Sequence, residues 1–223
     1  MNNDLNKKTQ EYYCYSRQEM LEFIPENCRK FLDVGCGGGY FGCAVKDKLP
    51  DAEVHGIELN KDACIEAEKN LDKVINSDIN EALNHIEDNF YDCISFNDVL
   101  EHFADPMDVL IKIKPKLAKN GVILASIPNV RYFEVVKDLI LHKKWTYKDA
   151  GILDYTHLRF FTEKSIPELF EPAGYNVCSI NGLNKNRFGL GFKALNFLLR
   201  GNLNDMKYLQ FACVAKVKEN PNG

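Results

Sequence analysis

Four carboxylates lie at or just after the ends of short apolar runs in the first half of this 223-residue chain: Asp33, Glu58, Asp78 and Asp98. In a parallel sheet the carboxyl ends of the strands meet at one edge, so we expect these side chains to line one cleft. Such a cleft favours a ligand with positive charge and disfavours the doubly charged pyrophosphate of a dinucleotide.

A glycine-rich turn follows the first of these acids. Gly35, Gly37 and Gly39 come directly after Asp33 and precede a helix-like segment. Glycine allows a sharp turn and lets a ligand approach the backbone closely, and the helix N-terminus offers N–H groups to an anionic part of that ligand. Glu58 follows Gly39 by 19 residues, the offset of an acid that binds both hydroxyls of a ribose.

Two other functions are compatible with this turn. The spacing of Gly37, Gly39 and Gly42 also satisfies the G-x-G-x-x-G pattern of an NAD(P)-dependent oxidoreductase, against which the four carboxylates weigh. A cofactor-binding module without turnover would keep the same glycines and acids. The residues of the turn alone do not show that an acceptor site exists.

Short apolar runs alternate with helical patterns from residue 30 onward, which is typical of a parallel sheet wrapped by helices. We expect an α/β fold with a Rossmann-like, doubly wound sheet in one domain over residues 30–217. Residues 1–29 are expected to form a helical cap over the cofactor, and residues 218–223 a tail. Insertions at 128–162 and 182–205 are expected on the acceptor side. The strands are expected at 30–35, 53–57, 73–76, 92–96, 121–127, 175–180 and 210–216, and the clearest helices at 60–71 and 105–117.

Composition narrows the possible partners and compartments. The net charge of −4, without a basic cluster, disfavours nucleic acid. No apolar stretch reaches the roughly 20 residues of a membrane span, and the first residues do not resemble a signal peptide. The eight cysteines include no C-x-x-C pair, so we expect free thiols, a cytoplasmic location and no metal site.

The run FLDVGCGGGYFG at residues 31–42 resembles the first motif of class I S-adenosylmethionine-dependent methyltransferases. HGIELN (55–60), INSDI (75–79), FNDVLEH (96–102) and LAKNGVILASIPN (117–129) resemble the later motifs of that family. The resemblance implies a seven-stranded sheet whose last strand is antiparallel. It also implies S-adenosylmethionine as cofactor, with S-adenosylhomocysteine as product. The implied cofactor-binding residues are Asp33, Gly35, Gly37, Gly39, Glu58, Leu59, Asp78, Ile79, Asn97 and Asp98.

Aromatic and basic residues precede this region. In similar enzymes the N-terminal segment folds over the cofactor, so Tyr13 and Arg17 are expected to contact its methionyl part. A guanidinium can bind a carboxylate through two parallel hydrogen bonds, which suits Arg17. The alternative is a solvated chain end.

Two of the five histidines are candidates for a general base. Transfer of a methyl group to a hydroxyl requires loss of the hydroxyl proton, and a base contributes about 10²–10⁴-fold to such a step. His102 follows the fourth expected strand, and His157 lies in an aromatic segment together with Asp154. The structural alternatives are that His102 begins a helix and that His157 bonds to Asp154.

The segment DYTHLRFFT at 154–162 resembles one in bacterial methyltransferases of cell-surface polysaccharide and sugar modification. Trp145, Tyr147, Tyr155 and Phe160 would suit a sugar ring, or would simply fill the insertion. We therefore expect a small-molecule acceptor with a sugar-type hydroxyl. The apolar segment at 182–205 predicts a helix that packs on the sheet, a homodimer interface or, least favoured, a membrane contact.

Overall fold

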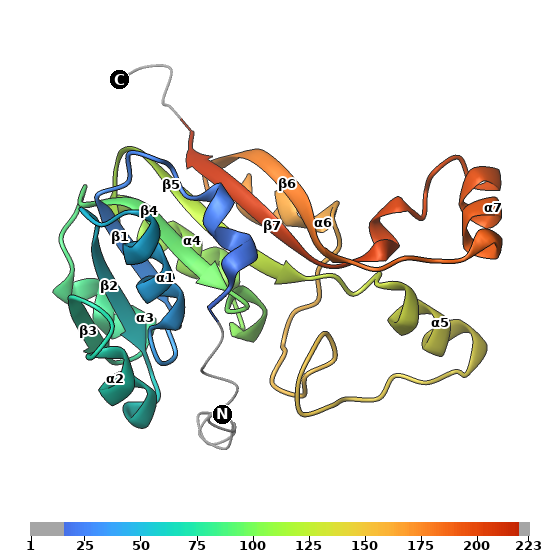
Figure 1. Cartoon of the computed structure of the whole chain (residues 1–223), viewed down its shortest axis with the longest axis horizontal. Coiled ribbons are helices and arrows are strands. Elements are labelled where there is room, and N and C mark those ends of the chain that lie inside the picture. Colours follow the sequence, from blue (N-terminus) through green and yellow to red (C-terminus); the bar gives the residue numbers. More distant parts are fainter. Residues whose placement is uncertain (1–15, 219–223) are drawn as a thin grey trace.

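The computed structural model describes residues 16–218, and in them seven strands form one sheet in the order β3-β2-β1-β4-β5-β7-β6 (Figure 1). Neighbouring strands from β3 to β5 are parallel, whereas β7 is antiparallel to both β5 and β6. This order confirms the expected Rossmann-like sheet with an antiparallel last strand. The strands are β1 (Lys30–Val34), β2 (Glu53–Glu58), β3 (Lys73–Asn76), β4 (Tyr91–Asn97), β5 (Leu117–Pro128), β6 (Tyr175–Lys185) and β7 (Tyr208–Val217).

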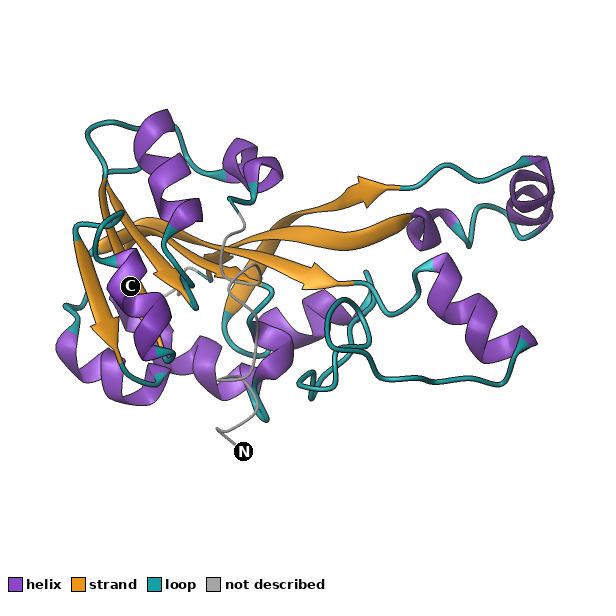
Figure 2. Ribbon diagram, turned by 60° about the horizontal axis from the view of Figure 1, so that its bottom comes forward, coloured by secondary structure: helices purple, strands orange, loops and turns teal. Residues whose placement is uncertain are grey.

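Helices cover both faces of the sheet (Figure 2). One apolar cluster joins the sheet to the 3-10 helix η3 (Gln18–Phe23) and to α1 (Tyr40–Lys48) and α2 (Lys61–Ala67). The other joins it to α3 (Ile79–Ala82), α4 (Pro106–Ile113) and α6 (Ser165–Phe170). Between β4 and α4, the short helix η5 (Leu100–His102) begins at the edge where the parallel strands end.

Side-chain caps fix where two of these helices begin. The Asn60 side chain accepts hydrogen bonds from the backbone N–H groups of Asp62 and Ala63, at 2.9 and 3.0 Å. Asp105 accepts one from Asp108 at 3.1 Å, and a proline occupies the first turn of α4. Each cap satisfies N–H groups that have no partner within the helix.

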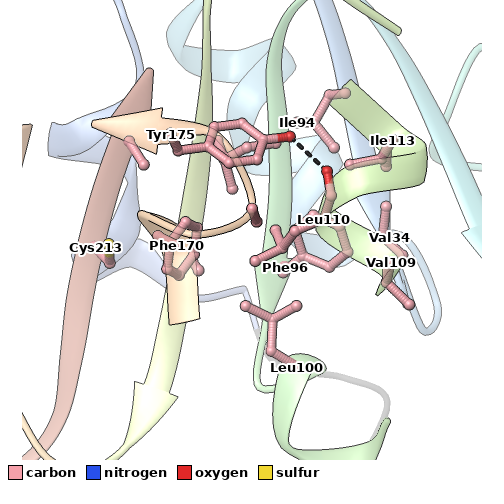
Figure 3. Packing of buried hydrophobic residues seen from close by; sticks show 14 of the residues in the cluster. Val34, Ile94, Phe96, Leu100, Val109, Leu110, Ile113, Phe170, Tyr175 and Cys213 are labelled. Atoms are coloured by element: carbon pink, nitrogen blue, oxygen red, sulfur yellow. Dashed lines mark hydrogen bonds between the residues drawn. The ribbon is translucent and has the colours of Figure 1, made fainter. Parts of the chain in front are cut away.

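The larger core cluster packs α4 and α6 against the centre of the sheet (Figure 3). Phe96, Leu110 and Phe170 are fully buried there. Tyr175 is also fully buried, and its hydroxyl donates to the backbone oxygen of Leu110 at 2.8 Å. The polar end of this ring therefore has a partner inside an otherwise apolar layer.

Two helices lie away from the sheet, at one end of the molecule: α5 (Phe133–Leu141) and α7 (Leu190–Leu198) (Figures 1 and 2). The structure describes both throughout, and none of their residues is buried. The Phe133 ring lies 4.8 Å from that of Phe188 and 5.4 Å from that of Phe192, which joins the two helices. We call residues 131–149 and 185–207 the distal arm.

Two features of composition can be checked directly. Seven cysteines lie within the described residues and all are free thiols. No helix between residues 16 and 218 has the length and apolar character needed to cross a membrane.

Candidate cofactor and acceptor site

The glycine turn joins the end of β1 to the start of α1. Gly35, Gly37 and Gly39 have φ angles of 72°, 54° and 77°, in the left-handed region that favours glycine. A Cβ on Gly39 would lie 3.1 Å from the backbone of Ala67, so a larger residue is disfavoured by close contact as well as by conformation. The turn is fixed to the neighbouring strand because the Gly35 N–H donates to Ile57 at 2.8 Å.

Glu58 connects the end of β2 to this turn. One carboxylate oxygen accepts from the Gly37 N–H at 2.9 Å, and the other from the Asn60 N–H at 2.8 Å. Burial raises the pKa of Glu58, and these N–H donors oppose that rise. The carboxylate therefore has a fixed orientation beside the turn. Leu59, the next residue, has 38% of its surface exposed.

Asp33 lies beneath the turn at the end of β1. It is only 2% exposed, and the Ser95 hydroxyl donates to it at 2.6 Å. Burial raises its pKa to about 7, and the charge of Glu58 adds to that rise. Asn97 and Arg17 both hold the pKa of Asp33 down, so these two side chains lie within electrostatic reach of it.

Asp98 is the centre of a polar network at the ends of β4, β5 and β7. The Gln210 amide donates to each of its carboxylate oxygens at 2.8 Å, and the Ser126 hydroxyl donates at 2.9 Å. The Arg17 guanidinium forms an ion pair with Asp98 and donates to Gln210 at 3.1 Å. Asp98 has a φ of 53°, and its backbone N–H donates to Ser126.

Arg17 thus reaches the site, as the sequence predicts, but here its partners belong to the protein. Its charge lowers the pKa of Asp33 and also that of Glu101, so it lies within electrostatic reach of both carboxylates. Its expected contact with the methionyl carboxylate stays a prediction. Tyr13 lies outside the described residues.

Asp78 and Ile79 follow β3, the strand beside β2, and so lie at the same edge of the sheet as Glu58. Asp78 accepts from the Asn80 N–H at 2.9 Å and so caps α3, while Ile79 is buried. Capping does not occupy every acceptor position of a carboxylate, so its expected role beside adenine also stays a prediction.

The two candidate bases are neighbours, although 55 residues separate them in the chain. The rings of His102 and His157 lie 4.7 Å apart at 80°. His102 Nδ1 is 3.2 Å from the Thr156 backbone oxygen, and His157 Nδ1 is 3.0 Å from that of Ile152. A carbonyl oxygen only accepts, so each Nδ1 carries the proton and each Nε2 is the basic nitrogen.

Glu101 is the third member of this cluster and was not predicted. It is 1% exposed, and burial raises its pKa to about 8. One carboxylate oxygen lies 3.8 Å from His157 Nε2. Its backbone oxygen accepts from the N–H groups of Leu158 and Arg159 at 2.8 and 3.0 Å, which fixes the returning insertion to η5. The motif FNDVLEH contains Glu101, but only the fold reveals that it is buried beside His157.

Aromatic residues adjoin this cluster. The Phe160 ring lies 6.4 Å from His157, 5.3 Å from Trp145 and 6.4 Å from Tyr147. Three of the four expected platform residues therefore form one group, which meets His157 through Phe160; Tyr147 and Tyr155 are 51% and 42% exposed.

Gln210 and Ser126 were also missed by the sequence analysis. Gln210 interrupts an apolar strand, YLQFACVAKV, and a polar residue in such a run is the signal that points to a buried partner. The partner itself, Asp98, is 112 residues away.

Residues 5–180 match the family described as methyltransferase domain. A ubiquinone biosynthesis O-methyltransferase of Psychrobacter arcticus is 31% identical over 170 residues, which is 71% of this chain and 63% of that protein. A mitochondrial ubiquinone biosynthesis O-methyltransferase of Candida albicans is 31% identical over 120 residues, covering 50% of this chain and 37% of that protein. The chain thus matches less than two thirds of the length of these curated relatives.

Solved structures show the same fold at low identity. A SAM-dependent methyltransferase of Archaeoglobus fulgidus has a TM-score of 0.68 and 18% identity, with 96% of each chain covered. One from Aquifex aeolicus has a TM-score of 0.61 and 15% identity, with 94% of each chain covered. The names of the curated relatives concern ubiquinone biosynthesis, so they give no support to the expected polysaccharide pathway.

Proposed function

This chain belongs to the methyltransferase domain family of S-adenosylmethionine-dependent enzymes, and we propose that it transfers a methyl group to a hydroxyl of a small molecule. Membership agrees with the enzyme class and cofactor expected from the motifs. It favours this function over that of an NAD(P)-dependent oxidoreductase.

The described residues fit S-adenosylmethionine. Gly35, Gly37 and Gly39 form a tight turn with left-handed φ angles before α1, the kind of turn that brings the backbone close to a cofactor, and Glu58 offers a fixed carboxylate to the ribose hydroxyls. When bound, the cofactor supplies an electrophilic methyl group on a cationic sulfur. The carboxylates of Asp33 and Glu58 favour such a cation at this edge of the sheet.

The observation that carries the hydroxyl acceptor is the cluster of His102, His157 and Glu101. An alcohol becomes a good nucleophile only when its proton leaves, and a neutral imidazole suits that task near pH 7. A thiol has less need of such a group, because its own pKa is about 8.5. The O-methyltransferase names of the relatives support the same acceptor atom.

A ring-shaped acceptor is supported by the aromatic residues around Phe160. Their faces can stack on a sugar ring or on a phenol, and both carry a hydroxyl. We place the sugar-type hydroxyl first, because of the DYTHLRFFT segment. The phenol is the second candidate, because of the relatives' names.

The test is to incubate the protein with methyl-labelled S-adenosylmethionine and separate panels of sugars and phenols, and to identify labelled products by mass spectrometry. We expect an O-methyl product from one panel. His102→Ala and His157→Ala are then compared. The variant that lacks the residue activating the hydroxyl should turn over about 10²–10⁴-fold more slowly. Affinity for S-adenosylhomocysteine should be retained, because that residue meets the acceptor. Label on a nitrogen, a protein or an RNA would refute the proposal.

A further inference from the structure

Glu101 is a buried acceptor group without a donor. Its side chain is 1% exposed, and neither carboxylate oxygen has a hydrogen-bond partner among residues 16–218. A buried carboxylate without compensation is costly, so native proteins usually pair it with donors or with a cation. His157 Nε2 lies 3.8 Å from one of these oxygens.

In both histidines Nδ1 has a backbone partner, so Nε2 is the basic nitrogen. The Nδ1–H groups of His102 and His157 point to backbone carbonyl oxygens, at 3.2 and 3.0 Å. Histidines that bind metals commonly have this arrangement, because the carbonyl fixes the tautomer and leaves Nε2 for the metal. The two carbonyls come from Thr156 and Ile152, in the insertion that folds over η5.

The separations approach those of ligands around one ion. Glu101, His102 and His157 each offer a ligand atom, and these three atoms lie within 4.8 Å of one another. Two ligands at about 2.1 Å from one ion are at most about 4.2 Å apart, so small side-chain rotations suffice. Two imidazoles and one carboxylate suit transition metals and leave coordination positions open.

We propose that Glu101, His102 and His157 bind one divalent transition-metal cation, of the Zn²⁺ or Mn²⁺ class, on the acceptor side of the site. The role of this cation in methyl transfer rests on the proposed function, whereas the binding of the cation does not. A hydroxyl on an open coordination position would lose its proton to solvent more easily. Its oxygen then forms a bond to the methyl carbon as the carbon–sulfur bond breaks, and that electron pair stays on sulfur. The histidines act as ligands in this arrangement, in place of a direct base.

Binding is tested without cofactor or acceptor. Chelator-treated protein is titrated with Zn²⁺ and Mn²⁺ by calorimetry, and with Co²⁺ by visible absorption, which reports nitrogen and oxygen ligation. We expect one saturable site per chain. Glu101→Gln and His157→Gln should each weaken binding at least tenfold.

The matched control is His142→Gln. His142 also lies beside a carboxylate, 3.0 Å from Asp138, but it is exposed and far from η5 in sequence. Its loss should leave metal affinity unchanged. Retained S-adenosylhomocysteine binding shows that Glu101→Gln is folded. Absence of saturable binding in the wild type, or equal binding in folded Glu101→Gln, would overturn the site.

A second assay separates the metal from the proposed function. If the ion binds but no hydroxyl acceptor is methylated, the metal site stands and the acceptor class fails. If hydroxyl methylation proceeds at full rate in metal-free protein, the role assigned to the ion is refuted and direct base catalysis by a histidine stands.

The distal arm carries an independent inference, which begins with its charge. Residues 131–149 and 185–207 contain ten basic and four acidic residues, a net charge of +6 in a chain of net charge −4. The remaining residues therefore carry −10. The positive charge of the chain is concentrated in the two segments that leave the sheet.

A hollow of about 1070 Å³ lies in this arm, and its lining contains no acidic residue. Five cationic side chains and three phenylalanines line it, which suits an anionic group attached to an apolar chain. The charged and aromatic lining residues are Lys185, Arg187, Phe188, Phe192, Lys193, Phe197, Arg200 and Lys207.

Large apolar side chains are exposed beside the hollow. On α7, Leu190, Phe197 and Leu198 are 83%, 84% and 75% exposed. On α5, Ile140 and Leu141 are 67% and 69% exposed. Both helices lie at the same end of the molecule in Figures 1 and 2. Exposed apolar residues among basic ones are typical of segments that lie in the interface of an anionic bilayer.

We propose that the distal arm docks on an anionic membrane surface. The basic residues would contact the headgroups, and the apolar side chains of α7 and α5 would enter the acyl boundary. A second copy bound arm to arm would bring two +6 surfaces together, which like-charge repulsion disfavours. The bilayer is therefore the occupant that the charge favours, which reverses the order expected from residues 182–205 alone, because residues 131–149 add five further basic residues at the same end of the molecule.

Co-sedimentation with vesicles tests this docking. We expect binding to phosphatidylcholine vesicles that contain phosphatidylglycerol, little binding to phosphatidylcholine alone, and release by high salt. Phe197→Asp and Lys193→Glu should each lower the bound fraction several-fold. The control is Ile65→Asp, which removes a 53% exposed apolar side chain from α2 on the sheet body. Equal binding to neutral vesicles, unchanged binding of Phe197→Asp, or a stable dimer that Phe197→Asp dissociates would refute the proposal.

Discussion

Glu58→Gln separates cofactor binding from folding, because it keeps the shape of the side chain and removes its charge. In the wild type both carboxylate oxygens accept backbone hydrogen bonds, from Gly37 at 2.9 Å and Asn60 at 2.8 Å. The amide has one acceptor oxygen, so its NH₂ group must face one of these N–H donors. Either the Gly37 N–H or the Asn60 N–H then loses its acceptor, while the backbone bond from Gly35 to Ile57 still links the turn to β2.

The expected magnitudes differ for binding and stability. A hydrogen bond to a charged group contributes about 1.5–3 kcal/mol, so loss of charge at the ribose should weaken binding of S-adenosylhomocysteine by about 10–150-fold. For the fold, loss of one backbone hydrogen bond costs about 1 kcal/mol. Removal of a buried charge, whose pKa burial raises, offsets part of that cost. The melting temperature should therefore fall by no more than about 2–4 °C.

Calorimetric titration with S-adenosylhomocysteine and thermal unfolding measure the two effects on the same samples. Glu53→Gln is the matched control, because Glu53 begins the same strand and bonds to His55 at 2.6 Å, away from the cleft. It should leave affinity unchanged. Wild-type affinity in a folded Glu58→Gln protein would refute the assignment of the ribose to Glu58.

Three further predictions concern the fold. Burial raises the pKa of Asp33 from 3.8 to about 7, so the folded protein binds this proton more tightly than the unfolded chain and loses stability as pH rises through that range. Between about pH 5 and pH 8, the free energy of unfolding in urea should therefore fall less for Asp33→Asn than for the wild type. Gly56→Ala places a Cβ 2.5 Å from the Cys36 sulfur, so it should lower the free energy of unfolding by about 1–3 kcal/mol. Adding Cys36→Ala removes that sulfur and should recover part of the lost stability in denaturant unfolding. Tyr175→Phe leaves the Leu110 oxygen without its 2.8 Å donor and should cost about 1 kcal/mol in the same assay; an unchanged midpoint would show that this bond contributes nothing.

Local signals predicted the parts of the fold that depend on neighbouring residues. Asn60 and Asp105 cap their helices as their residue types indicate, and the glycine turn follows β1 directly. Strand ends were less well predicted. The sixth strand, expected at 175–180, continues to Lys185 because it pairs with β7 along its whole length.

The missed site residues depend on packing between distant segments. Glu101 becomes a buried, donor-free carboxylate only because the insertion folds back over η5. Gln210 meets Asp98 only through the register of β7 beside β5. No spacing rule encodes either contact, because each depends on the arrangement of the whole sheet.

The carboxylates around the glycine turn also affect a thiol within it. Cys36 is 6% exposed, and burial together with the charges of Asp33 and Glu58 raises the pKa of its thiol well above the ordinary value. Only a thiolate is a strong nucleophile, and S-adenosylmethionine is an alkylating agent. Burial, reinforced by the charges of Asp33 and Glu58, therefore keeps Cys36 protonated. A protonated thiol is a poor nucleophile, so we expect the cysteine of this turn to resist methylation by S-adenosylmethionine.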